Sequence, residues 1–457
     1  MEQILTSYYR LPDGWEQPTP SETEVGDSGF FQFGSKIVCY GISNSGVSDR
    51  ASSAKAFDAL KSVRRNGSEI YLPFNISRVI ENLRFEHYVK QFAPPPKNFL
   101  NHVFVRKAYY SIREILPVHV RRYLQRSYFN GWRKLPFPEW PVDFTVDNLH
   151  EEYLRLLMEA RGITRIPFIW FWPQGAPSTV ILTHDVETAA GRDFTSTLMD
   201  IDASRGFRAS IQVVPEKRYE VPESYVQEIR DRGFEFNVHD LNHDGNLYRE
   251  RAEFLRRAQK INSYIRKYDA RGFRSGAMYR NLDWYDAFEF SYDMSAPNVA
   301  HLEPQRGGCC TVMPYFVGKI LEIPLTTSQD YSLFQILNDY SIDLWKEQIS
   351  LIHKRNGLIS FISHPDYLME ARARGVYLKL LEYLQQMTKR EGVWVTLPGE
   401  VDKWWRARND MKLVPRGSDW VIEGPEKERA RVAYAVLEKG RVCYQFASVT
   451  DNQAVAS

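Results

Sequence analysis

Short apolar runs alternate with helical patterns through the second half of the chain, and this alternation restricts the fold more than any other feature. The intervening residues show helical periodicity, most clearly at 224–231 and 249–268. Strands that alternate with helices favour a parallel sheet, either closed or open. Six to eight such units over about 220 residues fit a barrel. The runs are 179–185, 209–215, 234–239, 290–295, 320–326, 358–365 and 393–398, with a further segment beginning at Gly272.

Acidic and histidine side chains recur where these runs end. The first run is followed by Asp185 and Glu187, the run at 234–239 by His239 and His243, and the run at 358–365 contains His364. The carboxyl ends of barrel strands gather on one face, where barrel enzymes place their chemistry. We therefore expect these side chains to meet.

His239 and His243 are four residues apart. On a helical turn this spacing places both imidazoles on one side, where they can bind one divalent ion. An acidic oxygen from the first strand would complete three protein ligands. A HxxxH pair alone is a weak signal, because most such pairs are surface or core histidines. Its combination with THDVE upstream and SHP downstream, each at a strand end, is a stronger indication of a metal site.

These motifs resemble those of the polysaccharide deacetylase (NodB-homology, carbohydrate esterase) family. THDVE takes the place of the family's first motif, which supplies a general base and a metal ligand. His239 and His243 match the two metal-binding histidines of the second motif. His364 matches the general acid of the fifth. The resemblance implies Asp185 as base, with Glu187 and the two histidines as metal ligands and Asp185 as an alternative ligand.

The third and fourth motifs match more loosely. GFRSGAMY contains Arg274 and Tyr279, which resemble the arginine that orients the base and the tyrosine whose backbone helps to hold the oxyanion. The family's proline is missing, and the tyrosine follows the arginine by five residues instead of three. Asp293 is similar to the supporting aspartate of the fourth motif and is expected to anchor Arg274. Each side chain also has a structural alternative, such as a helix-capping acid or a core aromatic.

The resemblance covers Thr179–Pro398 and implies an α/β fold, a distorted (β/α) barrel of about seven strands. Around it, composition predicts an N-terminal α+β region and a small C-terminal β appendage, in which Lys439-Gly440 suits a hairpin turn. We expect four parts in chain order. They are 1–95 (α+β), 96–176 (a basic helical linker), 177–409 (the deacetylase-like barrel) and 410–457 (the β appendage).

Composition excludes several other classes. The 457 residues are 43% hydrophobic and 25% charged, which is typical of a globular protein and not of a disordered or fibrous one. A net charge of +2 argues against a protein that coats polyanions, so no nucleic acid partner is expected. The four cysteines form no CxxC pair and are expected to be reduced. The N-terminus resembles no signal peptide and no apolar stretch reaches about 18 residues, so a cytoplasmic protein is expected.

A basic segment at 104–134 has eight cationic residues and one acid, Glu114. Two interpretations stay open. The segment is either an amphipathic face that meets anionic lipid or a phosphorylated glycolipid, or a solvated helix packed on the next domain. The first would give the protein a peripheral contact with a membrane surface.

The expected activity is metal-dependent hydrolysis of an N-acyl group, acetyl or formyl, from an amino sugar. A cytoplasmic location would favour a precursor or lipid-linked saccharide of envelope or exopolysaccharide synthesis, so the partner is a carbohydrate or glycolipid. The resemblance implies zinc as the cofactor, with cobalt, nickel or manganese as alternatives. Hydrolysis of a non-sugar amide, or an inactive glycan-binding or scaffold protein, are the other hypotheses.

Overall fold

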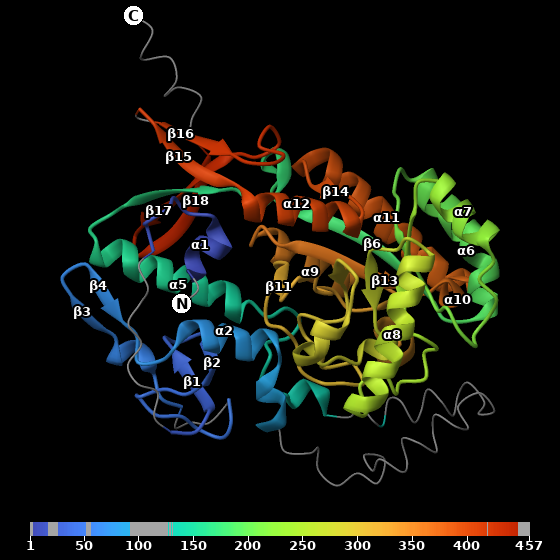
Figure 1. Cartoon of the computed structure of the whole chain (residues 1–457), viewed down its shortest axis with the longest axis horizontal. Coiled ribbons are helices and arrows are strands. Elements are labelled where there is room, and N and C mark those ends of the chain that lie inside the picture. Colours follow the sequence, from blue (N-terminus) through green and yellow to red (C-terminus); the bar gives the residue numbers. More distant parts are fainter. Residues whose placement is uncertain are drawn as a thin grey trace, which may run out of the picture. The chain divides into compact units, whose positions relative to one another are not determined.

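The computed structural model divides the chain into two compact units (Figure 1). The first unit consists of 1–84, 144–177 and 403–457, and the second of 85–143 and 178–402. Each unit is therefore assembled from separate stretches of sequence, and the four-part division expected from composition stays a prediction. The structure describes residues 3–16, 26–51, 56–91, 127, 129, 131–417 and 419–446.

A nine-stranded sheet forms the centre of the second unit. Its order is β11-β12-β10-β9-β8-β7-β6-β13, and β14 also pairs with β6. All of these pairs are parallel except β11 with β12, so the strands from β12 to β13 form the expected parallel set. The strands are β6 (Thr179–Val186), β7 (Ser210–Val213), β8 (Glu235–His239), β9 (Gly272–Arg274), β10 (Tyr292–Asp293), β11 (Tyr315–Val317), β12 (Ile320–Glu322), β13 (Leu358–Ser363) and β14 (Trp394–Val395).

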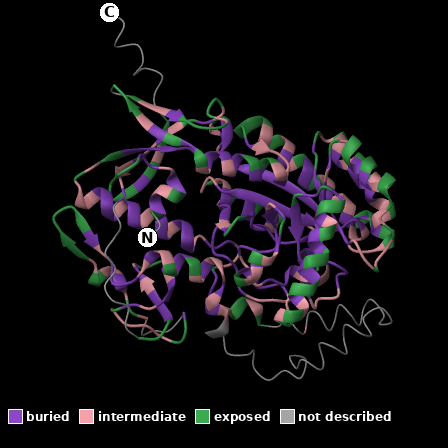
Figure 2. Ribbon diagram, in the orientation of Figure 1, coloured by how far each residue is buried: buried purple, intermediate pink, exposed green. Residues whose placement is uncertain are grey.

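The sheet curls into a half-barrel, which confirms the predicted α/β class and distorted barrel. Every residue of β6 and β13 is buried (Figure 2), as expected for parallel strands that are covered on both faces. The covering helices are amphipathic. In α8, for example, Phe254, Ala258, Ile261 and Ile265 form one buried stripe. The helices are α6 (Ala189–Ser204), α7 (Glu223–Asp231), α8 (Arg251–Lys267), α9 (Asp343–His353), α10 (Pro365–Leu368), α11 (Ala371–Glu391) and α12 (Pro398–Asp410).

A buried polar network fixes β6 and β13 to the helices. His184 places Nδ1 2.9 Å from the Ser363 hydroxyl and Nε2 2.8 Å from Asp202, and Tyr377 donates to the same carboxylate at 2.7 Å. All four side chains are buried. Because each polar group has a partner, the network satisfies groups that would be costly to bury alone. His184 thus has a structural environment.

The first unit contains short antiparallel sheets. The predicted C-terminal hairpin is confirmed, and its turn is Lys439-Gly440, both at positive φ. Its strand β17 also pairs with β5, so the C-terminal strands complete a sheet with a much earlier segment. The elements are α1 (Ile4–Tyr9), β1 (Gly29–Phe33), β2 (Ile37–Gly41), β3 (Arg64–Asn66), β4 (Glu69–Tyr71), α2 (Ile76–Arg84), α5 (Thr145–Ala160), β5 (Arg165–Ile169), β15 (Lys412–Arg416), β16 (Asp419–Glu423), β17 (Val432–Glu438) and β18 (Arg441–Phe446).

The basic segment 104–134 lies almost entirely outside the described residues, so neither interpretation of it is tested. Its described end includes the short 3₁₀ helix η4 (Trp132–Lys134). Within the part of the chain that the structure describes, no helix has the length and apolar character needed to cross a membrane.

Candidate metal and catalytic site

The two acids of the first motif lie at the carboxyl end of β6. Asp185 is the next-to-last residue of the strand and Glu187 follows its end. Residues two apart in an extended chain point to the same face, so both carboxylates are directed to one side of the sheet. Asp185 is buried, whereas the Glu187 side chain keeps 17% of its surface exposed. Glu187 is therefore the more accessible of the two acids.

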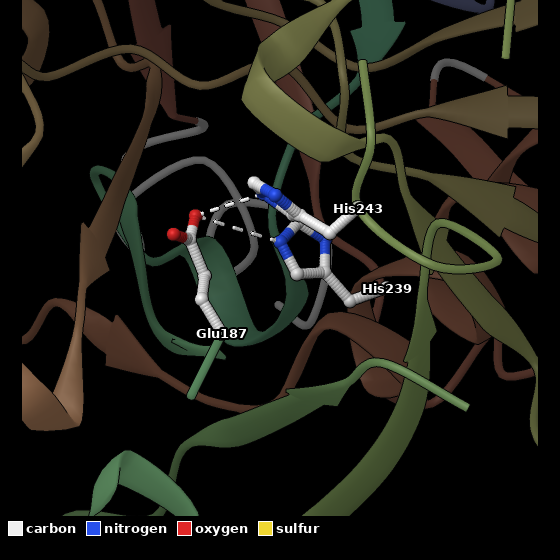
Figure 3. Close-up of side chains that lie close together, drawn as sticks. All are labelled: Glu187, His239 and His243. Carbon is white, nitrogen blue, oxygen red and sulfur yellow. Dashed lines mark ion pairs between the residues drawn. The ribbon is translucent and has the colours of Figure 1, made fainter. Parts of the chain in front are cut away.

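The two histidines of the second motif come from the end of β8 and the segment after it. His239 is the last strand residue, and Asp240 and His243 both adopt positive φ, at 56° and 52°. The expected helical turn is therefore wrong. Asp240 accepts a hydrogen bond from the next backbone amide, and Asn242 accepts one from the amide of Asp244. These local bonds favour a tight, irregular bend over a helix. The bend still brings the two imidazoles to one side (Figure 3).

Glu187 and the two histidines form a group that could hold a metal ion, with all three ligand atoms within 4.8 Å of one another (Figure 3). The Glu187 Oε1 lies 2.9 Å from His243 Nε2 and 4.0 Å from His239 Nε2. Although the first distance is short, neither buried Nε2 has a hydrogen-bonding partner of normal geometry in the described part of the chain. Two orphaned imidazole nitrogens facing one carboxylate fit a divalent cation.

The tautomer of His239 also suits metal binding. Its Nδ1 lies 3.1 Å from the Arg274 carbonyl oxygen, which can only accept a hydrogen bond. Nδ1 therefore has the proton, and Nε2 presents its lone pair toward Glu187. A histidine that binds a metal through one ring nitrogen is commonly oriented by a hydrogen bond from its other nitrogen to a backbone carbonyl.

Arg274, at the end of β9, fixes Asp185. Its guanidinium donates to Asp185 Oδ1 at 2.6 Å, to the Thr183 hydroxyl at 2.7 Å and to the Met294 carbonyl at 3.0 Å. Burial by itself would raise the pKa of Asp185, but the charges of Arg274, His239 and His364 outweigh it and hold the pKa below its ordinary value. Asp185 is therefore an ionised carboxylate with a fixed orientation.

Glu187 is also held in its ionised form. Burial would raise its pKa, but the adjacent His243, together with contacts from His239 and His364, lowers the pKa well below the ordinary value. The two acids thus reach the same charge state through different partners, a guanidinium for Asp185 and imidazoles for Glu187.

His364 directly follows β13 and lies close to Glu187. Its Nε2 lies 3.5 Å from Glu187 Oε1. Its Nδ1 lies 2.6 Å from Asp330 Oδ1, and its backbone amide donates to the other Asp330 oxygen at 2.7 Å. Burial would lower the pKa of His364, but Asp330 and then Glu187 raise it well above the ordinary value. A protonated imidazole is the result.

Asp330 is a site residue that the sequence reasoning missed. It follows the apolar run 320–326 by four residues, so an acid after a strand-like run, the signal used for Asp185, also marked this position. Glu303 was missed as well. Its buried Oε2 accepts a hydrogen bond from Gln329 at 2.6 Å, and burial raises its pKa to about 7.

Asp293 does not bond directly to Arg274 in the described structure. It accepts from the Tyr285 hydroxyl at 2.6 Å and from the Ser295 hydroxyl at 2.8 Å, and Ser295 Oγ in turn accepts from the Ser275 amide at 2.8 Å. Since Ser275 follows Arg274 directly, Asp293 contacts that segment through Ser295 instead of through an ion pair.

Tyr279 lies apart from the contacts described above. Its backbone amide bonds to the Gly276 carbonyl, and its ring lies beside Gly245, close after His243 in sequence. The expected oxyanion contact near Tyr279 stays a prediction. Cys309 and Cys310 are buried, and burial raises the pKa of each thiol, which does not suit a nucleophile.

No family model and no curated protein matches the chain. Similar solved structures include a protein named as a polysaccharide deacetylase from Mycobacterium smegmatis (16% identity, 55% of this chain and 98% of that one, TM-score 0.42). Others are the peptidoglycan deacetylase PdaC from Bacillus subtilis (11%, 50% and 93%, TM-score 0.33) and a CE4 family pseudoenzyme from Bacillus anthracis (15%, 49% and 65%, TM-score 0.31). The structures that resemble this chain thus bear the name of the family that its motifs resemble.

Proposed function

We propose that the chain is a metal-dependent hydrolase that removes an N-acyl group from an amino sugar. One observation supports this most: two ionised carboxylates and three imidazoles, from distant parts of the sequence, converge at the carboxyl ends of three parallel strands. Glu187, His239 and His243 supply metal ligands, whereas Asp185 and His364 have partners that hold them as a base and an acid. Groups whose neighbours hold them in different charge states cluster at functional sites.

Glu187, His239 and His243 would hold the ion. One carboxylate and two imidazoles are a common zinc donor set, and cobalt, nickel or manganese are alternatives. When bound, the ion would supply Lewis-acid polarisation of the acyl carbonyl and a water of lowered pKa.

Asp185 would act as the general base. A base must be ionised and aimed before the reaction. The Arg274 guanidinium meets both requirements, and its own position is fixed by its bond to the Thr183 hydroxyl. Asp185 takes a proton from the attacking water, and the resulting hydroxide forms a bond to the acyl carbon. Arg274 stays paired with the carboxylate and orients it. The backbone near Tyr279 remains our proposed source of an oxyanion contact.

His364 would act as the general acid. Asp330 binds its Nδ1, so the protonated Nε2 faces Glu187 and the interior of the site. The collapse of the tetrahedral intermediate breaks the carbon–nitrogen bond, and His364 gives its proton to the departing amine. A base and an acid held in opposite charge states at one pH are the arrangement that hydrolysis of an amide requires.

The proposed substrate is an N-acetylated or N-formylated amino sugar in a precursor or a lipid-linked saccharide. The protonated His364 suits an amine leaving group. The two carboxylates Asp185 and Glu187 are both held ionised, whereas a glycosidase needs one carboxyl group of its pair protonated as the acid. An N-acyl bond is therefore a better match than a sugar–sugar bond.

Replacing the base tests the proposal. The purified wild type should bind about one divalent ion per chain and release acetate or formate from N-acylated amino-sugar oligomers. Asp185→Asn should keep the ion but lose activity by about 10²- to 10⁴-fold, because the amide cannot take the proton. Metal content by mass spectrometry and acyl release by chromatography are the measurements.

Two controls make the result specific. Asp193→Asn replaces an exposed aspartate on the neighbouring helix α6 and should leave both readouts unchanged. His239→Ala should lose the ion. If wild-type protein binds no metal and releases no acyl group, and Asp185→Asn binds glycans as tightly as wild type, the chain is an inactive glycan-binding protein instead.

A further inference from the structure

A cavity of about 540 Å³ lies in the second unit, and none of the proposed catalytic or metal-binding residues lines it. Its volume is within the roughly 300–1,000 Å³ range of small-molecule sites. The cavity is lined by residues from the segment before the barrel and from two loops of the barrel. These residues are Trp132, Arg133, Leu135, Pro136, Pro138, Glu139, Trp140, His301, Leu337, Asp339 and Leu344.

Two tryptophans form an aromatic wall of this cavity. The Trp132 and Trp140 rings meet edge to face at 4.7 Å, and Trp140 also stacks on His301 at 5.8 Å with an interplanar angle of 18°. Both indoles are only partly buried, and both pack on a core cluster that includes Leu302. The rings are therefore held in position from behind while part of their surface remains accessible, which suits an apolar ligand face.

His301 supports this wall from behind. Only 2% of its surface is exposed, and its ring stacks on that of Trp140. Burial and the nearby Arg306 lower its pKa to about 4, so the imidazole is neutral at neutral pH. Because both ring nitrogens are buried, His301 positions Trp140 and leaves contacts with a ligand to the more exposed residues of the lining.

The charges at the cavity do not favour an anion. Arg133 is the one basic residue of the lining, whereas Glu139 and Asp339 are acidic. A phosphate group would meet more negative than positive charge here. Hydroxyl groups, by contrast, find two carboxylate acceptors and a guanidinium donor.

The two loops that contribute to the cavity wall also contain Asp330, which binds His364, and the residues that contact its neighbour Gln329. His301 is two residues from Glu303, which accepts a hydrogen bond from Gln329. Gln329 precedes Asp330, the partner of His364, and Tyr331 packs on the core cluster behind the tryptophans. A ligand in the cavity would therefore lie against loops that continue directly into the proposed catalytic site.

We infer that this cavity binds a sugar ring of the substrate glycan, one that is not itself deacylated. The accessible parts of the indoles would cover the C–H face of the ring, while Arg133, Glu139 and Asp339 would bind its hydroxyls. The identity of the glycan rests on the proposed function. If the inference holds, residues outside the parallel sheet give the protein a preference for longer saccharides.

Binding to an inactive chain tests this inference. Full-length Asp185→Asn would be titrated by calorimetry with the dimer and the hexamer of N-acetylglucosamine. Adding Trp140→Ala should weaken hexamer binding by roughly tenfold, the effect of one lost aromatic contact, and leave dimer binding nearly unchanged. Glu139→Gln, at an exposed position, should weaken the hexamer less and cannot act through misfolding.

Trp394→Phe is the matched control. Trp394 is a partly buried tryptophan in β14, which pairs with the start of β6, at the end of the strand opposite the site. The substitution Trp394→Phe should leave binding of both the dimer and the hexamer unchanged. Equal weakening of dimer and hexamer by Trp140→Ala, or displacement of the hexamer by inorganic phosphate, would overturn the inference. If the wild type releases no acyl group yet Trp140→Ala weakens the hexamer alone, the proposed function fails while the sugar site stands.

Discussion

Asp185 and Glu187 are chemically similar and only two residues apart, but their partners give them different uses. A guanidinium occupies one oxygen of Asp185, whereas Glu187 faces three imidazoles. A carboxylate already paired with arginine is a poor ligand but a well-oriented base. A carboxylate beside orphaned imidazole nitrogens is a good ligand. The assignment of the two roles therefore follows from neighbours and not from the acids themselves.

Asp330 determines both the orientation and the charge of His364. Asp330→Asn would remove the negative charge that raises the pKa of His364 and leave burial, which lowers it. Less of the imidazole is then protonated at neutral pH. We expect kcat to fall by about 10- to 100-fold and the alkaline limb of the kcat profile to move to lower pH. Initial rates of acyl release measured across pH would show both effects.

A second buried aspartate–histidine pair provides the control for this prediction. Asp202 accepts from His184 on the other side of β6 and takes no part in the site. Asp202→Asn should lower the melting temperature without shifting the pH profile. An unshifted profile in Asp330→Asn would mean that Asp330 has only a structural role.

At the level of elements, most strands were predictable and the links between them were not. The runs that became β6 and β13 are mainly apolar, those that became β7 and β8 alternate polar with apolar residues, and the strand ends that they predicted hold the acids and histidines. The bend between His239 and His243 was wrongly predicted, because positive φ at Asp240 and His243 is set by local side-chain bonds that the helical spacing does not reveal. The pairing of Asp330 with His364 joins residues 34 apart, which no local pattern indicates.

The start of helix α6 connects stability with the site. Thr188 is its N-cap residue, and its hydroxyl accepts from the Gly191 amide at 3.0 Å. Thr188→Ala would leave that amide without its cap and should lower the free energy of unfolding by about 1 kcal/mol. Because Thr188 follows Glu187 directly, metal affinity should weaken too. Urea denaturation and metal titration are the measurements.

Thr188→Ser keeps the capping hydroxyl and should restore both properties to nearly wild-type values. If Thr188→Ala loses stability but keeps the metal affinity of the wild type, the end of β6 alone positions Glu187, independently of the helix start.

At the scale of the whole molecule, long-range pairing limits what sequence can predict. The pairing of β5 with β17 joins residues more than 260 positions apart, from Ile169 with Val432 to Arg165 with Val436. Composition divides a chain into consecutive parts, and it cannot show that a late hairpin completes a sheet begun before the barrel. The fold class of the central region was predictable because its strands and helices follow one another in sequence.

The stability of the molecule as a function of pH depends on its buried acids, and Glu303 is one whose titration lies near neutrality. Its pKa is raised from 4.5 to about 7 by burial, so the folded chain holds this proton more tightly than the unfolded chain. The resulting stabilisation is complete below about pH 4.5 and is lost as pH rises through 7. The loss amounts to about 3 kcal/mol, an upper value for a single group.

Glu303→Gln has no charge to titrate, and its amide oxygen can still accept from Gln329. We therefore expect the variant to be more stable than wild type at pH 8 and similar at pH 5, with urea midpoints across this range as the measurement. Glu382→Gln, at an exposed position, should reproduce the wild-type curve. Parallel curves for wild type and Glu303→Gln would contradict the prediction, because they would mean that solvent reaches Glu303 and leaves its pKa near the ordinary value. If Glu303→Gln loses the pH dependence of stability but still releases the acyl group, Glu303 acts on stability and not on the chemistry at His364.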